Sequence, residues 1–387
     1  MTLIGDESDR PYERPPLSKD YLAGKVDRES VFVHPPGWYA ENDVDLRLGS
    51  GVTALDRAGR RVHLADGAQV AYDRLLLATG AAPRTLSIPG ADARGVLYLR
   101  RLEDSERIRD VLAGASRLAI IGAGWIGLEV AAAARRAGVE VTVLEAAALP
   151  LSRVLGPRVA AVFDRLHREH GVDLRYRVTV SEITAVDGRA TGVRLADGTE
   201  FAADAVLVAV GAVANVRLAE QAGLHVDNGI VVDSGLRTSD PDIFAAGDVA
   251  SAFHSLLDKH IRVEHWANAL NQGSAAATAM LGRDTRYDEL PYFYTDQYDL
   301  GMEYHGHVEP DGYDDVVFRG DVAAREFIAF WLSGGRVLAG MNVNVWDVDA
   351  PIKTLIRSGE VVDVEALADP ERSLDELAER TTSARRE

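Results

Sequence analysis

The stretch LAIIGAGWIGLEVAAAARRAGVEVTVLE, residues 118–145, decides the fold. It begins as an apolar strand, turns through three glycines, continues as an alanine-rich helix to about residue 137, and ends in a second strand that closes on Glu145. A G-x-G-x-x-G pattern is specific when it lies between a strand and a helix with an acid after the next strand. The stretch therefore predicts a doubly wound α/β fold that binds a dinucleotide.

Each glycine of the turn has a physical reason in such a fold. Gly122 permits the tight turn, Gly124 lets the main chain approach a pyrophosphate, and Gly127 allows the helix to pack closely on the sheet. The diphosphate is expected at the helix N-terminus, where free N–H groups and the helix dipole stabilise an anion. Ile126 of the same turn belongs to the predicted NAD-binding residues.

Glu145 indicates which nicotinamide cofactor is used. A carboxylate at this place accepts hydrogen bonds from the ribose hydroxyls of NAD and repels the 2′-phosphate of NADP. Residues 146–148 are all alanine and offer no basic group to a phosphate. The sequence therefore predicts NADH rather than NADPH, the alternative being an acid that merely ends a strand.

Two stretches of the chain repeat each other. VHLADGAQVAYDRLLLATGA at 62–81 and VRLADGTEFAADAVLVAVGA at 193–212 are identical at 11 of 20 positions. Each reads as a hairpin with an Asp-Gly turn, followed by a buried strand that ends at a glycine. Duplication of a whole dinucleotide-binding domain is the better interpretation, although a chance repeat of a hairpin pattern is the alternative.

The first residues, MTLIGDE at 1–7, resemble the end of the second strand of the NAD-binding copy. By that correspondence, Asp6 or Glu7 is the ribose-binding acid of the first copy. We expect the first strand, glycine turn and first helix of that copy to lie before residue 1. A polypeptide of residues 1–387 alone is then expected to retain FAD weakly and to have little activity.

Composition excludes several classes of function. The chain has 387 residues, a net charge of −18 and no cysteine. Such acidity argues against a nucleic-acid partner, and the lack of cysteine excludes disulfides, thiolate metal ligands and redox dithiols. No apolar run is long enough to span a membrane and no signal peptide is evident, so a cytoplasmic protein is expected.

Further motifs identify a family. RPYERPPLSKDYLAG, LLLATGAAPR, DIFAAGDVA, HWANALNQG, YFYTDQYD and WDVDAPIKTLI, together with the glycine turn, resemble the FAD-dependent, NADH-linked ferredoxin reductases of bacterial oxygenase systems. The resemblance covers nearly the whole chain. It implies two Rossmann-like domains of the glutathione-reductase type and a C-terminal α+β domain. The segments expected are 1–85 and 212–290 for FAD, 86–211 for NAD, and 291–387 for the C-terminal domain.

The resemblance also implies where FAD lies. At the adenosine and phosphate end, Asp6 would meet the ribose, Val52 would contact the adenine end through its backbone, and Arg100 would lie near the phosphates. Asp248 would bind the ribitol or the pyrophosphate.

At the flavin end, Lys19 would lie against the isoalloxazine and the main chain of Trp266 would touch its pyrimidine edge. The turn at Thr79 and Gly80 belongs to the same expected site.

Lys19 and Glu129 are the expected catalytic residues. We expect them to pair when NAD is absent and Glu129 to accept a hydrogen bond from the nicotinamide amide. The alternative for Glu129 is an acid that favours a helix N-terminus. Gly211 is expected to let the nicotinamide stack on the flavin.

The function implied is transfer of electrons from NADH, through FAD, to a small iron–sulfur protein that feeds an oxygenase or a cytochrome P450. Disulfide reductases and cysteine-dependent NADH oxidases of this fold are disfavoured because the chain has no cysteine. Rubredoxin or a quinone is an alternative acceptor. A monomer or weak homodimer with no membrane and no metal site is expected. Trp331 and Trp346 are candidates for stacking or electron entry, with core packing as the alternative.

Overall fold

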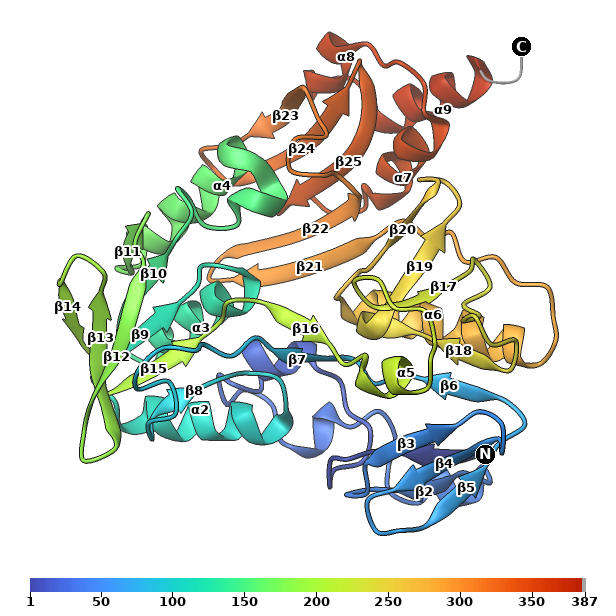
Figure 1. Ribbon diagram of the computed structural model, residues 1–387. Coiled ribbons are helices and arrows are strands. Elements are labelled where there is room, and N and C mark those ends of the chain that lie inside the picture. Colours follow the sequence, from blue (N-terminus) through green and yellow to red (C-terminus); the bar gives the residue numbers. More distant parts are fainter. Residues whose placement is uncertain (385–387) are drawn as a thin grey trace. The chain divides into compact units, whose positions relative to one another are not determined.

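The computed structural model describes residues 1–384, which form two compact units (Figure 1). Unit 1 consists of residues 1–16, 25–82 and 212–289. Unit 2 consists of residues 17–24 and 83–211 and of the chain from Leu290 onward. The division into four segments drawn from the sequence stays a prediction.

Unit 2 contains the dinucleotide-binding fold that the glycine turn predicts. Its sheet has five parallel strands in the order β11-β10-β9-β15-β8. The central strands carry continuous apolar runs because a parallel sheet is covered on both faces. The strands are β8 (Val96–Leu97), β9 (Arg117–Ile121), β10 (Glu140–Glu145), β11 (Asp173–Tyr176) and β15 (Ala205–Val208). The helices are α2 (Leu102–Gly114), α3 (Trp125–Arg136) and α4 (Ser152–Glu169).

An antiparallel sheet follows in the same unit, with strands in the order β12-β13-β14. It comprises β12 (Val180–Val186), β13 (Arg189–Leu195) and β14 (Glu200–Ala202). Apolar residues of β12, β13 and β15, among them Ile183, Val193 and Val206, share one core cluster. The packing of this sheet against the parallel one is therefore fixed by burial.

The C-terminal part of unit 2 is the expected α+β domain. Its antiparallel sheet has the order β21-β22-β25-β24-β23. The strands are β21 (Tyr292–Gln297), β22 (Leu300–Gly306), β23 (Asp315–Asp321), β24 (Glu326–Ser333) and β25 (Arg336–Val343). The helices are α7 (Asp349–Ser358), α8 (Val364–Ala368) and α9 (Leu374–Ala384).

The two tryptophans of this domain lie in different environments. Trp331 is 0% exposed and donates its indole N–H to the Leu155 carbonyl at 3.2 Å, so it fills the core. Trp346 is 54% exposed. Packing accounts for Trp331, whereas a surface role for Trp346 stays a prediction.

Unit 1 is built from smaller sheets. Parallel pairs form between β1 (Thr2–Ile4) and β2 (Asp45–Arg47) and between β6 (Leu75–Leu77) and β18 (Ile243–Ala245). The other sheets contain β3 (Val52–Asp56), β4 (Arg61–Leu64) and β5 (Gln69–Ala71); β17 (Ile230–Val232), β19 (Ala250–His254) and β20 (Lys259–Ile261); and β7 (Ala81–Pro83) with β16 (Ala212–Ala214). The helices are α1 (Trp38–Glu41), α5 (Arg217–Gln221) and α6 (Trp266–Met280).

Both copies of the internal repeat contain an antiparallel hairpin, β4–β5 in unit 1 and β13–β14 in unit 2, but the parallel strands of the two units are joined differently. In unit 2, β9 joins the pair β10–β11 to β15. In the described residues of unit 1, no strand joins the pair β1–β2 to the pair β6–β18. Leu3 of β1 is accordingly 38% exposed, whereas Val143 of β10 is 0% exposed.

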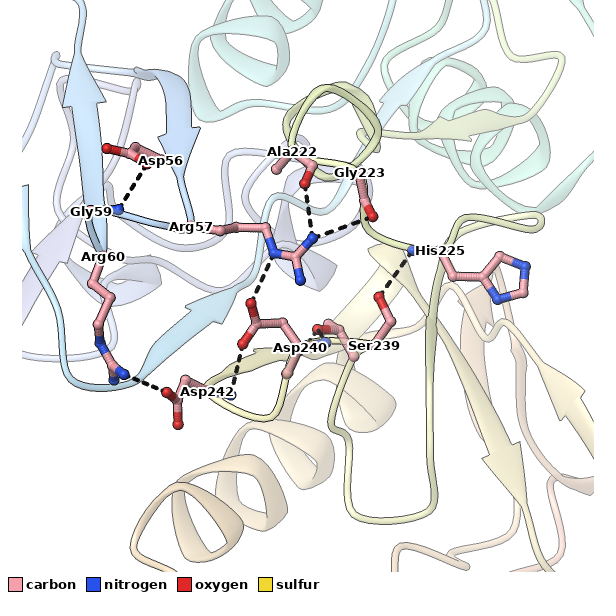
Figure 2. A network of polar contacts seen from close by, with 11 residues as sticks. Asp56, Arg57, Gly59, Arg60, Ala222, Gly223, His225, Ser239, Asp240 and Asp242 are labelled. Carbon is pink, nitrogen blue, oxygen red and sulfur yellow. Dashed lines mark hydrogen bonds and ion pairs between the residues drawn. The ribbon is translucent and has the colours of Figure 1, made fainter.

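A polar network ties the β3–β4 hairpin to the segment 222–242 of unit 1 (Figure 2). Arg57 donates its Nε–H to Asp240 at 2.8 Å and an Nη1–H to the Ala222 carbonyl at 3.2 Å. Arg60 bonds Asp242 at 2.6 Å. Burial acts to raise the pKa of Asp240, but the Arg57 hydrogen bond and charge, the Asp242 N–H and the charge of Arg60 together outweigh it, so that the pKa is lowered. The network therefore favours the ionised form.

The described helices lack membrane-spanning character. None of them combines the length and the apolar composition that a bilayer crossing requires.

Candidate functional site

The glycine turn of unit 2 has the backbone that each glycine suggests. Gly122 has φ +103°, and a Cβ on it would overlap the Ala209 carbonyl. A Cβ on Gly127 would overlap the Gly122 carbonyl, so helix and strand approach too closely for any side chain. Gly124 differs, because nothing lies within 4 Å of the place where its Cβ would be. Space is therefore open at the position where the main chain is expected to meet a pyrophosphate.

Helix α3 begins directly behind this space. Gly124 is its N-cap and has no side chain to cap the first turn. Four N–H groups at a helix start lack intrahelical partners, and the helix dipole adds positive potential there. The turn therefore fits a diphosphate. Ile126 lies in the first turn and is 41% exposed.

Glu145, at the end of β10, lies against the same turn. Its Oε2 accepts from the Ala123 N–H at 2.7 Å, and its Oε1 accepts from the Ala147 N–H at 2.7 Å. A carboxylate has about four acceptor positions, so ribose hydroxyls can share the two oxygens with these N–H groups. Glu145 therefore holds the turn in shape as well as offering a ribose ligand, a structural role that the sequence pattern did not reveal.

Glu129, on α3, lies in a buried polar cluster of unit 2. Lys19 Nζ is 2.8 Å from Glu129 Oε1, and the side chains are 15% and 5% exposed. The pairing expected for these two residues is thus present. Ser18 donates its hydroxyl to Glu129 Oε2, and Thr295 donates its hydroxyl to Oε1 at 2.5 Å. A buried carboxylate is tolerated when it is paired and hydrogen-bonded in this way.

Lys19 also interacts with residues of β21. Its ammonium lies 5.5 Å from the centroid of the Tyr294 ring, within cation–π range. Burial raises the pKa of Asp296, and the charge of Glu129 adds to this effect while Lys19 opposes it. Lys19 therefore places a positive charge near two carboxyl groups, those of Glu129 and Asp296.

Gly211 ends the segment 83–211 of unit 2. It has φ +97°, and nothing lies within 4 Å of its Cβ position. Its carbonyl accepts the Arg84 N–H at 2.9 Å. A substitution here would be strained by backbone conformation even though it meets no neighbour.

Of the residues assigned to FAD, those in unit 1 lie at strand ends and turns. Thr79 donates its hydroxyl to the Asn215 carbonyl at 2.8 Å, and Asn215 returns a bond to the Thr79 carbonyl at 2.8 Å. Gly80, with φ +64°, accepts the Asn215 N–H. Val52 begins β3, and Asp6 follows β1.

Asp248 lies in the short turn 247–249 after β18. The preceding Gly247 has φ +77° and donates its N–H to Gln272 of α6 at 2.8 Å. Trp266 is the first residue of α6. The Ala267 N–H is bonded to the His265 ring at 3.2 Å. The α6 N-terminus is therefore partly capped by the chain's own side chain.

The cofactors differ in how well the described residues fit them. The turn, Glu145 and the start of α3 lie next to one another in unit 2 and fit the NAD site expected from the sequence. Lys19 and Arg100 belong to unit 2 and the other residues assigned to FAD belong to unit 1. The described residues of unit 1 hold no counterpart of the turn from Gly122 to Gly127. The FAD contacts of individual residues therefore stay a proposal.

Comparison with known proteins identifies the family. Residues 1–273 match the family Pyridine nucleotide-disulphide oxidoreductase, and residues 292–378 match Reductase C-terminal. The chain is 44% identical over 349 residues to putidaredoxin reductase of Pseudomonas putida, covering 89% of this chain and 82% of that one. It is 43% identical over 344 residues to rhodocoxin reductase of Rhodococcus erythropolis, covering 89% and 80%.

A solved structure agrees with these relatives. The covalent putidaredoxin reductase–putidaredoxin complex matches with a TM-score of 0.93 and 40% identity, covering 99% of this chain and 92% of that one. The fold, the two matched family models and the sequence identities all indicate the same family. This chain belongs to the pyridine nucleotide-disulphide oxidoreductase family, as a member with the reductase C-terminal domain.

Proposed function

We propose that this protein is an NADH-dependent flavoprotein that passes electrons to a ferredoxin serving an oxygenase or a cytochrome P450. The observation that carries the proposal is 44% identity to a putidaredoxin reductase across 89% of this chain. Bound FAD supplies the conversion of a two-electron donor into a source of single electrons. The residues of the chain bind and orient the two cofactors.

The turn at Gly124 and the start of α3 bind the NAD diphosphate. Open space at Gly124 supports this role, because a phosphate must reach the main-chain N–H groups. Glu145 sets the preference for NADH, since a 2′-phosphate would approach a carboxylate whose oxygens already accept two N–H bonds. No general acid or nucleophile is needed for hydride transfer, so positioning supplies the catalysis.

Lys19 and Glu129 act at the nicotinamide end. Their ion pair holds the Glu129 side chain in place before NADH arrives. On binding, the nicotinamide amide N–H becomes a donor to Glu129 in place of Lys19. Glu129 Oε1 thus keeps a hydrogen-bond donor when the cofactor binds.

The absence of cysteine narrows the activity within the family. A disulfide reductase needs a redox dithiol, and the 387 residues contain none. Electrons must therefore leave toward an external acceptor. A cytoplasmic location and a monomeric or weakly dimeric state are part of the same proposal.

The proposal is tested with the full chain, excess FAD and a defined set of acceptors. Cytochrome c reduction by NADH is expected to require an added [2Fe–2S] ferredoxin and to be at least about tenfold slower with NADPH. Equal rates without ferredoxin, or turnover only with rubredoxin or a quinone, would contradict it.

A further inference from the structure

Four buried side chains of unit 2 form one hydrogen-bond chain that starts at Glu129. Thr295 Oγ1 lies 2.5 Å from Glu129 Oε1, Gln297 Nε2 lies 3.2 Å from Thr295 Oγ1, and His167 Nε2 lies 2.8 Å from Gln297 Oε1. Glu129 is 5% exposed and the other three are 0% exposed. The hydrogen-bond chain thus runs from α3 across β21 to α4 through buried side chains alone.

The direction of every bond follows from the carboxylate. An ionised carboxylate only accepts, so the Thr295 hydroxyl must donate to it. Its oxygen then accepts from the Gln297 amide, which fixes the amide orientation. Gln297 Oε1 is left to accept from His167 Nε2–H. All three donors therefore point toward Glu129.

His167, the last member of the hydrogen-bond chain, also donates toward Glu129. Burial lowers the pKa of His167 to about 4, so the ring is neutral at physiological pH. No described residue bonds to its Nδ1. The neutral ring with its proton on Nε2 is the form that this geometry requires. An amide in the middle makes the chain a fixed dipolar support rather than a path for proton hopping.

Strand geometry explains why the support is rigid. Thr295 and Gln297 are two residues apart on β21, so their side chains lie on one face of the sheet. Gln297 bonds its own strand neighbour on one side and α4 on the other. Thr295 is held by this bond in the rotamer that meets Glu129.

We infer that Thr295 and Gln297 are positioning residues that hold the Glu129 carboxylate for the nicotinamide amide. The inference rests on the proposed role of Glu129 at the nicotinamide. When Lys19 gives way to the cofactor, the Thr295 bond to Oε1 is retained and the carboxylate keeps its orientation. Ser18 supports the other oxygen.

The test separates the nicotinamide end from the rest of NAD. Binding of NAD⁺ and of ADP-ribose, which lacks the nicotinamide, is measured by titration calorimetry with the full chain and three variants. Thr295→Val is expected to weaken NAD⁺ about tenfold, as loss of a charged-group hydrogen bond does, and to change ADP-ribose less than about twofold. Thr295→Ser restores NAD⁺ binding to within about threefold, and Gln297→Met weakens it about threefold.

Several outcomes overturn the inference. They are an unchanged NAD⁺ affinity in folded Thr295→Val, an equal loss of NAD⁺ and ADP-ribose, and no rescue by serine. If Thr295→Val melts below the assay temperature, the binding of NAD⁺ and ADP-ribose to Gln297→Met tests the inference instead. An unchanged ratio of the two dissociation constants in that variant overturns the inference.

Failure of the proposed function is distinguishable from these results. NAD⁺ selectivity that depends on Thr295 in a protein that reduces no ferredoxin supports the inference while refuting the electron acceptor. Glu129→Gln with unchanged NAD⁺ affinity refutes the role of Glu129, and the inference with it.

Discussion

Lys19 Nζ lies 2.8 Å from Glu129 Oε1 although the two residues are 110 positions apart in the chain. Both belong to unit 2, whose segment 17–24 leaves unit 1 to reach it. The ion pair is therefore part of the fold of this unit as well as of its site.

Removing one partner of the pair is expected to destabilise unit 2. Lys19→Met leaves Glu129 buried with only hydroxyl donors, which costs about 3 kcal/mol in the free energy of unfolding. The double variant Lys19→Met/Glu129→Gln is expected to regain at least about 1 kcal/mol, because it leaves no lone charge. Urea unfolding of the wild type, Lys19→Met, Glu129→Gln and the double variant gives the coupling energy between the two residues. Additive losses would show that the pair contributes nothing.

Two glycines of one turn should respond in opposite ways to alanine. Gly127→Ala brings a Cβ onto the Gly122 carbonyl and is expected to lower the unfolding free energy by about 2 kcal/mol or more. Gly124→Ala meets no atom and has φ −81°, so stability changes by less than about 0.5 kcal/mol.

Gly124→Ala is nevertheless expected to weaken NAD⁺ binding about tenfold or more, because the methyl group occupies the approach of the pyrophosphate. Thermal melting and calorimetric titration of both variants check the contrast. Unchanged NAD⁺ affinity in the Gly124 variant would show that the diphosphate binds elsewhere.

Glu145→Gln should change cofactor preference. The amide keeps a carbonyl oxygen for one N–H of the turn but removes the negative charge that faces a 2′-phosphate. The NADH-to-NADPH ratio of kcat/KM is expected to fall about tenfold, mainly through weaker NADH binding and less repulsion of NADPH. Glu140→Gln, on the same strand and exposed, serves as the control. A ratio that stays constant would leave Glu145 with its structural role alone.

His167 should make stability depend on pH. Its folded pKa of about 4 lies below its ordinary 6.5, so the unfolded chain takes up a proton at higher pH. The stabilisation is complete above pH 6.5 and is lost as the pH falls toward 4. It amounts to about 2 kcal/mol between pH 7 and 4.5.

His167→Gln is expected to remove this part of the slope, whatever its constant effect on stability. The same substitution at His305 serves as a comparison, because burial also lowers the pKa of that ring to about 4. Urea unfolding at several pH values measures both slopes. A wild-type slope that His167→Gln leaves intact would mean that this ring is protonated in the folded protein.

The parts of the fold that repeat a local pattern were predictable from the sequence. The strand–glycine–helix stretch at 118–145 folds as β9, α3 and β10, because each of its signals is local. The pairing of Lys19 with Glu129 was predictable only because the family resemblance implies Lys19 beside the flavin and Glu129 lies on the helix of the NAD turn. Residue type alone could not predict whether Trp331 lies in the core or at the surface, because packing in three dimensions decides its burial.

The remainder of the site depends on contacts between distant segments. Ser18, Thr295, Gln297 and His167 are common residue types in ordinary helices and strands. Thr295 lies 166 positions from Glu129, and nothing in its neighbourhood marks it as a ligand of a carboxylate. The internal repeat located the hairpins and strands, but it carried no information on these side chains.

The central claim is that electrons pass from NADH to a ferredoxin. The most direct measurement is stopped-flow reduction of a purified [2Fe–2S] ferredoxin by the full chain with FAD and NADH under anaerobic conditions. Bleaching of the iron–sulfur absorbance is expected to require NADH and the protein together, and Glu129→Gln is expected to slow it about tenfold or more. Consumption of NADH with the ferredoxin left oxidised would contradict it.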